Sequence, residues 1–255
     1  GYLELLDIPF TGASSAAITT AIDKCQTKAI LAAAGIDTPQ SWRAASLLSD
    51  GALRITEKTA ANLSLPVIVK PAREDGSIGI DQSSVATTEA ELETALERAI
   101  GRFGADNVLI EKFIEGREFY VGFLGNTELK ALPVSEITFA DLPAEFRPIM
   151  SYDAKWNPDS IEQRSFRRLC PAPLDAEDRQ RVIATCEAAY KTVGLSGYGR
   201  VDVRWEEATG RLHVLDVNAN PDITDGQGLP FTAAYDGLSY PELVQTIIDC
   251  ALQRH

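Results

Sequence analysis

Two stretches near the end of the chain, residues 197–205 and 212–218, alternate between polar and apolar positions. Neighbouring side chains of a strand point to opposite faces, so an alternation with a period of two predicts half-buried strands. A polar run that ends in Gly210 separates the two stretches and is typical of a hairpin turn. The pattern therefore predicts a β-hairpin with one apolar and one polar face.

The polar face of this hairpin combines charged and amide side chains. Arg200 and Asp202 share it on the first strand. Asp216 and Asn218 share it on the second strand, whereas His213 falls on the opposite face. With the turn midway between the strands, Asp202 lies across from Asp216. These oxygen ligands suit a hard cation such as magnesium, but an exposed face with ordinary ion pairs explains the pattern equally well.

Helical and strand-like periods are mixed along the rest of the chain. Apolar residues recur at helical spacing in the ranges 14–35, 88–99, 175–193 and 240–254. A capping box at Thr88 marks the start of the second helix, and Gly35 marks the end of the first. Short apolar runs predict strands at residues 8–12, 41–44, 67–69, 107–110, 118–124 and 128–137. This mixture predicts an α+β or α/β protein with helices packed on antiparallel sheets.

Two segments show no such period. Residues 140–169 are polar and rich in Pro and Asp, and a shorter loop rich in Pro and Gly lies between residues 218 and 240. A loop as long as the first one is usually either a functional lid or disordered. The residues alone leave both interpretations open.

Composition excludes several classes of protein. Of the 255 residues, 45% are hydrophobic and 24% are charged, which is ordinary for a soluble globular protein. A net charge of −13 without any Lys/Arg run argues against a nucleic-acid partner. No apolar run approaches the roughly 20 residues that span a bilayer. Four cysteines without a CxxC pair predict reduced thiols in a cytoplasmic protein, and two histidines argue against a histidine zinc site or a Ser-His-Asp triad.

Two further segments carry candidate nucleotide chemistry. Lys70 ends a predicted strand just before a loop that contains Gly76 and Gly79, and such loops let backbone amides and a lysine approach a phosphate. No Walker or GxGxxG motif is present. Residues 110–118 could hold a flat base against Phe113. The alternatives are a surface corner for the first segment and a charged inter-domain linker for the second.

Taken in order, these segments resemble the ATP-grasp superfamily and, within it, the D-alanine–D-alanine ligase family. The resemblance covers nearly all of the chain and rests on residues 11–12, 23–24, 67–71, 76–79, 108–118, 151–156, 170–172, 199–202 and 215–218. It implies an α+β, ATP-grasp fold in which two α+β subdomains with antiparallel sheets clasp ATP between them. The implied division is a remnant of an N-terminal subdomain at 1–23, a central subdomain at 24–114 and a C-terminal subdomain at 115–255 with a lid loop at 140–169.

The resemblance also implies roles for individual residues. The ATP-binding residues would be Lys24, Lys70, Gly76, Ser77, Glu111, Lys112, Phe113, Ile114, Glu118 and Leu215. The two lysines 24 and 70 would contact phosphates, and Glu118 would hold the ribose. Two magnesium ions, with manganese as the alternative ion, would be bound by Asp202, Asp216 and Asn218. The catalytic residues would be Arg200, which stabilises charge on the acyl phosphate and the tetrahedral intermediate, and Lys155, which reaches the γ-phosphate on closure.

Several features depart from the family pattern. The N-terminal subdomain is absent apart from its last helix and strand, so we expect a fragment or a chain whose start has been removed. Trp156 stands where these ligases usually have a tyrosine, and Asp222 stands where they have a glycine. Gln227 and Gly228 replace a Ser-Leu pair that recognises the acceptor carboxylate, and Asp216 replaces a glutamate. The expected substrate-binding residues are Tyr152, Trp156, Asp222 and Gln227.

The implied function is an ATP-dependent carboxylate–amine ligase that forms a C–N bond through an acyl phosphate, joining amino acids or a similar small acid and amine. A carboxylate attacks the γ-phosphate, metal ions neutralise the charge, and an amine then displaces phosphate. The alternatives are a genuine D-alanine–D-alanine ligase of cell-wall synthesis, a non-catalytic ATP-binding module and an ATP-grasp kinase. We expect a cytoplasmic enzyme with small-molecule partners and no nucleic-acid or membrane partner, and a homodimer is an open alternative to a monomer.

Overall fold

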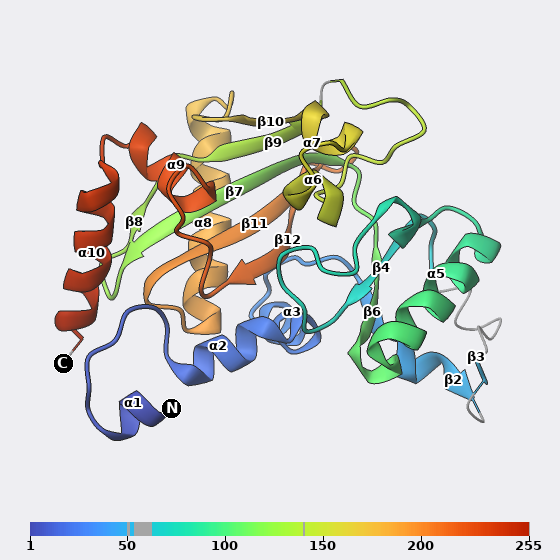
Figure 1. Cartoon of the computed structure of the whole chain (residues 1–255), viewed down its shortest axis with the longest axis horizontal. Coiled ribbons are helices and arrows are strands. Elements are labelled where there is room, and N and C mark those ends of the chain that lie inside the picture. Colours follow the sequence, from blue (N-terminus) through green and yellow to red (C-terminus); the bar gives the residue numbers. More distant parts are fainter. Residues whose placement is uncertain (50–51, 54–62, 140, 255) are drawn as a thin grey trace. The chain divides into compact units, whose positions relative to one another are not determined.

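The computed structural model describes residues 1–49, 52–53, 63–139 and 141–254 (Figure 1). The chain divides into two compact units, each assembled from separated stretches of sequence. The first unit comprises Gly1–Thr38, Glu115–Thr138 and Arg168–His255, and the second comprises Pro39–Ile114 and Phe139–Arg167. The subdomain division at 1–23, 24–114 and 115–255 stays a prediction from the family resemblance.

A six-stranded sheet with the order β10-β9-β7-β11-β12, and with β8 beside β7, underlies the first unit. Its strands are β7 Gly116–Gly125, β8 Lys130–Ala131, β9 Ser135–Phe139, β10 Phe166–Leu169, β11 Gly197–Glu206 and β12 Arg211–Asn218. Strand β7 runs antiparallel to β8, β9 and β11, and β11 runs antiparallel to β12. The predicted hairpin of alternating residues is β11–β12, at the edge of the sheet.

The register of this hairpin matches the prediction. Asp202 on β11 pairs with Asp216 on β12, and Arg200 pairs with Asn218. Since each side chain shares a face with its directly opposite partner, the two carboxylates face each other across the strands. The polar patch inferred from the alternation is therefore present in the fold.

A β-bulge changes the hairpin beyond this point. Val203 pairs with Val214, so Leu215 is an extra residue between two paired positions. The extra residue shifts the alternation, and His213 pairs with Arg204 on the polar face. The prediction that His213 lies on the apolar face was wrong, because the alternation of residue types does not reveal a bulge.

The helices described in the first unit are α1 Tyr2–Leu5, α2 Ser15–Ile22, α3 Lys24–Ala33, α8 Ala176–Val193, α9 Gly228–Tyr235 and α10 Tyr240–Leu252. The sequence predicts one helix over residues 14–35, but Asp23 divides it. Its backbone is extended, and its carboxylate accepts hydrogen bonds from the amides of Cys25 and Gln26, so it caps a new helix. Two other predictions were wrong: residues 8–12 form no strand, and α9 occupies part of the expected Pro/Gly loop.

Helix α8 packs on the apolar face of this sheet (Figure 1). The buried valines of the hairpin meet the buried side of the helix, and together these residues are Val201, Val203, Val214, Val217, Val182, Cys186, Ala189 and Tyr190. Burial of each large apolar side chain contributes about 1.5–3 kcal/mol. This layer fixes the hairpin from behind and leaves its polar face available for chemistry.

Helix α9 is held against the same sheet by a close approach at Gly122 of β7. A Cβ atom at Gly122 would come within 2.6 Å of Leu229 Cδ1, and Leu229 is fully buried. Only a residue without a side chain lets α9 lie this near the strand. The contact sets the position of the first turn of α9, which begins at Gly228 beside Arg200.

The second unit contains a four-stranded antiparallel sheet with the order β1-β6-β4-β5. Its strands are β1 Ser41–Arg43, β4 Val67–Pro71, β5 Val85–Ala86 and β6 Val108–Lys112, with β2 Leu48–Ser49 and β3 Ala52–Leu53 as a separate pair. The short 3-10 helices are η1 Ala44–Leu47, η2 Gln82–Ser84 and η3 Ala105–Asn107. Helix α5 Glu89–Phe103 begins with the predicted capping box between Thr88 and Glu91 and packs on the sheet through Leu92, Leu96 and Ala99.

The expected lid also belongs mainly to the second unit. Of its residues, 140 lies outside the described part of the chain. Two short helices, α6 Tyr152–Trp156 and α7 Ile161–Ser165, interrupt the irregular segment. Each has five residues, too few to produce a visible helical period, so the prediction of a loop throughout was wrong. Ser151 and Ser160 cap them by accepting backbone N–H groups of the first turn.

Candidate functional site

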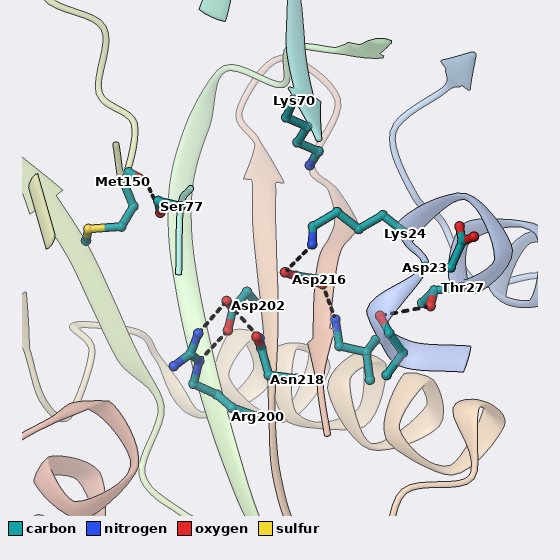
Figure 2. Close-up of polar contacts among 12 residues, drawn as sticks. Asp23, Lys24, Thr27, Lys70, Ser77, Met150, Arg200, Asp202, Asp216 and Asn218 are labelled. Atoms are coloured by element: carbon teal, nitrogen blue, oxygen red, sulfur yellow. Dashed lines mark hydrogen bonds and ion pairs between the residues drawn. The ribbon is translucent and has the colours of Figure 1, made fainter. Parts of the chain in front are cut away.

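The polar face of β11–β12 holds the first group of predicted site residues (Figure 2). Arg200 donates to both oxygens of Asp202, from Nε to Oδ1 at 2.7 Å and from Nη2 to Oδ2 at 2.8 Å. Asn218 Nδ2 donates to Asp202 Oδ2 at 3.2 Å. Asp216 lies on the neighbouring strand, and its Oδ2 forms an ion pair with the ammonium of Lys24, the first residue of α3, at 3.7 Å. The structure therefore brings all five of these predicted residues together within the first unit.

Burial controls the electrostatics of this group. The removal of Asp202 from water raises its pKa, Arg200 opposes that shift, and Asp216 adds to it. Burial is the largest single influence on Arg200 and lowers its pKa, but the charge of Asp202, the hydrogen bonds to it and the nearby Tyr120 and Asp216 together raise the arginine pKa. The guanidinium also lies 4.6 Å from the centre of the Tyr120 ring. A second cation at this face would relieve the remaining repulsion between Asp202 and Asp216.

The donor set fits magnesium as a partner of a nucleotide. Asp202, Asp216 and Asn218 offer only oxygen ligands, which suit a hard cation. No cluster of three or more His, Cys, Asp or Glu side chains suited to a metal ion occurs in the described residues. Magnesium typically takes one or two carboxylates and completes its shell with water and phosphate oxygens. This face could thus hold a metal together with phosphates rather than by protein alone.

Glu118 lies one row further along the same face, and its partners were not foreseen from the sequence. The carboxylate accepts from the Tyr120 hydroxyl at 2.9 Å and forms an ion pair with Arg204. Glu118, Arg204 and His213 are aligned across β7, β11 and β12, and all are buried. Arg204 could have been found, because it continues the spacing of two from Arg200 and Asp202. His213 required knowledge of the bulge.

In the second unit, Lys70 and Glu111 form a buried ion pair. Lys70 Nζ lies 3.0 Å from Glu111 Oε1, and the side chains are 9% and 2% exposed. Their strands, β4 and β6, are adjacent in the sheet. Removal of one partner of such a pair typically costs about 3–5 kcal/mol, because the other charge stays buried. The lysine predicted for phosphate and the glutamate predicted for the base therefore sit side by side.

The other residues predicted to contact adenine in this unit follow Glu111 directly in the sequence, at the end of β6 and just beyond it. Lys112 is half-buried, and Phe113 and Ile114 are buried at the end of β6. Phe113 packs with Val85 and Ile149 in a small apolar cluster. Leu215, the remaining residue of the predicted adenine set, lies at the bulge of the first unit and is half-buried.

The glycine loop has a left-handed backbone at three positions. Gly76, Ser77 and Gly79 have φ values of +64°, +61° and +77°. For serine this conformation costs roughly 1–2 kcal/mol. Ser77 Oγ donates to the Met150 carbonyl at 2.6 Å, which offsets part of that cost (Figure 2). The loop shape is thus tied to the segment that carries α6.

Helix α6 carries three predicted site residues, Tyr152, Lys155 and Trp156. Trp156 Nε1 donates to the Gly76 carbonyl at 2.8 Å, although the side chain is 52% exposed. Tryptophan offers only an N–H donor, so it bonds a backbone carbonyl of the loop. This bond is a second link between α6 and the glycine loop, beside that of Ser77 to the Met150 carbonyl.

Asp222 and Gln227 lie on the loop before α9, in the first unit. The Thr224 amide donates to Asp222 Oδ1 at 2.8 Å, and hydrogen bonds from Thr224 together with nearby Arg200 lower the Asp222 pKa. Gln227 precedes α9 without a side-chain cap bond. A Cβ atom at Gly228 would lie 3.3 Å from Arg200 Nη1, so the loop closely approaches the arginine. The structure therefore groups the predicted acceptor residues of this unit around Arg200.

Comparisons with known proteins identify the family to which the chain is similar. Residues 30–249 match the family model for the D-ala D-ala ligase C-terminus. The chain is 34% identical over 254 residues to D-alanine–D-alanine ligase from Desulfotalea psychrophila, covering 100% of this chain and 73% of the relative. The structure of the Bacillus anthracis D-alanine–D-alanine ligase complexed with ATP aligns with a TM-score of 0.76 and 28% identity, covering 99% of this chain and 73% of that one.

A third similar structure carries a different pair of amino acids in its name. The D-Ala:D-Ser ligase VanG from Enterococcus faecalis aligns with a TM-score of 0.73 and 26% identity, covering 97% of this chain and 66% of that one. Among the described helices, none is long and apolar enough to cross a membrane. The chain belongs to the D-alanine–D-alanine ligase family and is an ATP-dependent C–N ligase with the ATP-grasp fold.

Proposed function

We propose that this ligase uses MgATP to activate a small carboxylic acid as its acyl phosphate and joins that acid to a small amine, both of them amino acids or close analogues. The observation that best supports the proposal is the face on which Asp202 and Asp216 oppose each other and Asp202 holds Arg200 by two hydrogen bonds. It supplies metal ligands and a fixed cation. Such a reaction needs positioned charge rather than covalent catalysis.

Arg200 is proposed to stabilise the acyl phosphate and the tetrahedral intermediate. Its guanidinium is buried and oriented by Asp202 and Tyr120, so little reorganisation is needed as negative charge develops. Lys24 and Lys70 are proposed to bind phosphate oxygens. Each is buried and forms an ion pair with a carboxylate, Lys24 with Asp216 and Lys70 with Glu111.

Asp202, Asp216 and Asn218 are proposed to hold two magnesium ions, with manganese as the alternative ion. When bound, the metal would neutralise phosphate charge during transfer. Asp216 is shorter by one methylene than a glutamate, but it faces Asp202 directly and keeps the ligand type. Glu118 is proposed to bind the ribose, with Tyr120 and Arg204 fixing its carboxylate.

The second unit is proposed to supply the remaining nucleotide contacts. Gly76 and Ser77 would cover the phosphates, because left-handed residues turn backbone amides toward one side of the loop. Lys155 of α6 is proposed to contact the γ-phosphate. The proposed base contacts are Glu111, Lys112, Phe113 and Ile114, with Leu215 of the first unit.

Tyr152, Trp156, Asp222 and Gln227 are proposed to choose the substrates. The carboxylate of Asp222 carries negative charge near Arg200, where a glycine is usual in the family. This difference favours an acid and amine other than two molecules of D-alanine. The second candidate is D-alanine–D-alanine ligation itself, which is the activity in the name of the Desulfotalea psychrophila relative. A cytoplasmic location is part of the proposal, and a homodimer is an alternative to a monomer.

The test measures release of ADP and phosphate with MgATP across a panel of D- and L-amino acids and small acids and amines, alone and in pairs. We expect phosphate release that depends on one acid and one amine, with the joined product detected by mass spectrometry. Vigorous turnover with D-alanine alone would favour the second candidate. Tight MgATP binding by calorimetry without turnover on any pair would overturn the ligase proposal, and phosphorylated product without condensation would indicate a kinase.

A further inference from the structure

Gln82 connects the end of the glycine loop to the segment that leads into α6, all within the second unit. Its Oε1 accepts the Arg147 N–H at 2.7 Å, and its Nε2 lies 3.3 Å from the Arg147 carbonyl oxygen. The same Nε2 donates to Glu162 Oε1 at 2.8 Å. Because an N–H needs an acceptor and a carboxylate needs a donor, these partners determine which way the amide is oriented.

Glu162 is the other half of this connection. The residue is 6% exposed, and its Oε1 accepts from Ser151 Oγ at 2.7 Å as well as from Gln82. No lysine, arginine or histidine in the described ranges forms an ion pair with it. Neutral donors therefore satisfy a buried carboxylate, which makes each donor costly to lose.

Helix α6 depends on this network for its position. Ser151, fully buried, accepts the Ala154 N–H at 3.0 Å and so caps the helix while it donates to Glu162. The Lys155 carbonyl accepts from Gln163, the residue after Glu162, at 3.3 Å. A helix of five residues has little stability of its own, so contacts to neighbouring segments decide where it lies.

We infer that Gln82 and Glu162 are positioning residues that hold Lys155 in place for phosphoryl transfer. The inference rests on the proposed function, in which Lys155 contacts the γ-phosphate. Gln82 lies three residues after Gly79, the last glycine of the loop, and Glu162 accepts from Ser151, the cap of the helix that carries Lys155. The pair therefore fixes the position of Lys155 relative to the glycine loop. It does so independently of the hydrogen bond from Trp156 to the Gly76 carbonyl.

The test exchanges the donor and the acceptor between the two residues. Gln82→Glu keeps the acceptor for the Arg147 N–H but places two carboxylates together. Adding Glu162→Gln restores one donor and one acceptor to the pair, because the amide at position 162 can then donate to the carboxylate at position 82. Ser83→Ala is the matched control, because Ser83 lies in the same turn and bonds Asp81 and Arg98 rather than the segment of α6. Steady-state rates of phosphate release and the ATP KM are measured for all four proteins.

We expect Gln82→Glu to lower kcat by about 30-fold or more and to change the ATP KM by less than about threefold, because small misplacement of a catalytic group slows the chemical step. The double variant should recover to within about fivefold of wild type, and Ser83→Ala should stay within about twofold. A wild-type kcat in Gln82→Glu would overturn the inference. A loss that the double variant does not repair, or a loss carried by the ATP KM, would also overturn it.

Hydrogen exchange of the amides in residues 147–156 provides a second readout that needs no turnover. Gln82→Glu should speed exchange in this segment, and Glu162→Gln added to it should slow exchange again. Failure of the proposed function would appear as wild-type protein without acid-dependent turnover. Failure of this inference would appear as normal turnover or normal exchange in Gln82→Glu.

Discussion

Arg200 holds Asp202 through a two-bond fork, with its Nε and Nη2 atoms 2.7 Å and 2.8 Å from the two carboxylate oxygens. The residues are two positions apart on one strand, so the fork needs no movement between elements. The Tyr120 ring lies 4.6 Å from the guanidinium, and Nη1 approaches Gly228. The arginine is therefore oriented before any substrate binds, with one side directed toward the loop of Asp222 and Gln227.

This geometry predicts that lysine cannot replace the arginine. Arg200→Lys keeps a positive charge but loses the planar fork and the contact with the tyrosine ring. We expect kcat to fall by about 10²–10³-fold, as for the loss of one preorganised oxyanion donor. Arg211→Lys, at an exposed arginine of the same hairpin, should keep the wild-type kcat. Steady-state kinetics with the best acid–amine pair checks both variants, and equal kcat values for them would contradict the role of the fork.

Mutations on the face of Asp202 and Asp216 and mutations on α6 should change different properties of the enzyme, MgATP affinity for the first and substrate choice for the second. Asp216→Ala removes a proposed metal ligand and the partner of Lys24, so we expect MgATP affinity to fall at least about tenfold, or 1.4 kcal/mol. Trp156→Ala should mainly change which acid or amine is used, because Trp156 lies half-exposed on α6. Calorimetry with MgATP and KM values for the substrates check this division. An equal loss of MgATP affinity in the two variants would count against it, and Asp225→Ala serves as an exposed acidic control.

Cys170 should be an unreactive thiol at neutral pH. Burial raises its pKa to about 11, although nearby Arg168 opposes the shift. The thiolate is the reactive form, and at pH 8 only about 0.1% of the Cys170 side chain would be thiolate. The alkylation rate should therefore rise roughly tenfold per pH unit toward pH 11. Mass spectrometry of iodoacetamide labelling from pH 7 to 10 checks the profile. A rate that levels off near pH 8.5 would show an ordinary thiol instead.

The shape of the glycine loop should depend on Gly79. Its φ is +77°, and a Cβ atom there would lie 2.6 Å from the Phe103 ring and 2.9 Å from Pro71. Gly104→Ala is the control in the same unit, because φ is +79° but nothing lies within 4 Å of the added atom. We expect Gly104→Ala to lower the free energy of unfolding by about 1–2 kcal/mol and Gly79→Ala to lower it clearly more. Urea unfolding of both proteins decides this, and equal losses would mean that the packing around Gly79 is loose.

The alternation of polar and apolar residues was enough to predict part of the sheet in the first unit. It predicted the β11–β12 hairpin and the pairing of Asp202 with Asp216, because a face that packs on a core specifies the register. It misplaced His213, because the bulge at Leu215 changes backbone geometry without a mark in the sequence. The continuous apolar spacing around Asp23 likewise concealed the break between α2 and α3, where a side chain competes for backbone amides.

Long-range partners were the part of the site that the sequence did not reveal. Glu118 and Arg204 are distant in the chain, and their ion pair depends on the pairing of β7 with β11. The bonds of Gln82 to Arg147 and Glu162 depend on two short helices that have no visible period. The order of residue types along the chain predicted the kind of chemistry. The contacts that support the site residues could be found only from the three-dimensional structure.

In the proposed reaction, the acid is activated by phosphoryl transfer to its own carboxylate. The most direct measurement supplies the acid with ¹⁸O in both carboxylate oxygens, together with MgATP and the amine, and analyses inorganic phosphate by mass spectrometry. The carboxylate oxygen that attacks the γ-phosphorus leaves with phosphate when the amine displaces it. We therefore predict one ¹⁸O in phosphate for each molecule of joined product, with ADP as the other product. Unlabelled phosphate, or label released in AMP, would contradict activation through an acyl phosphate.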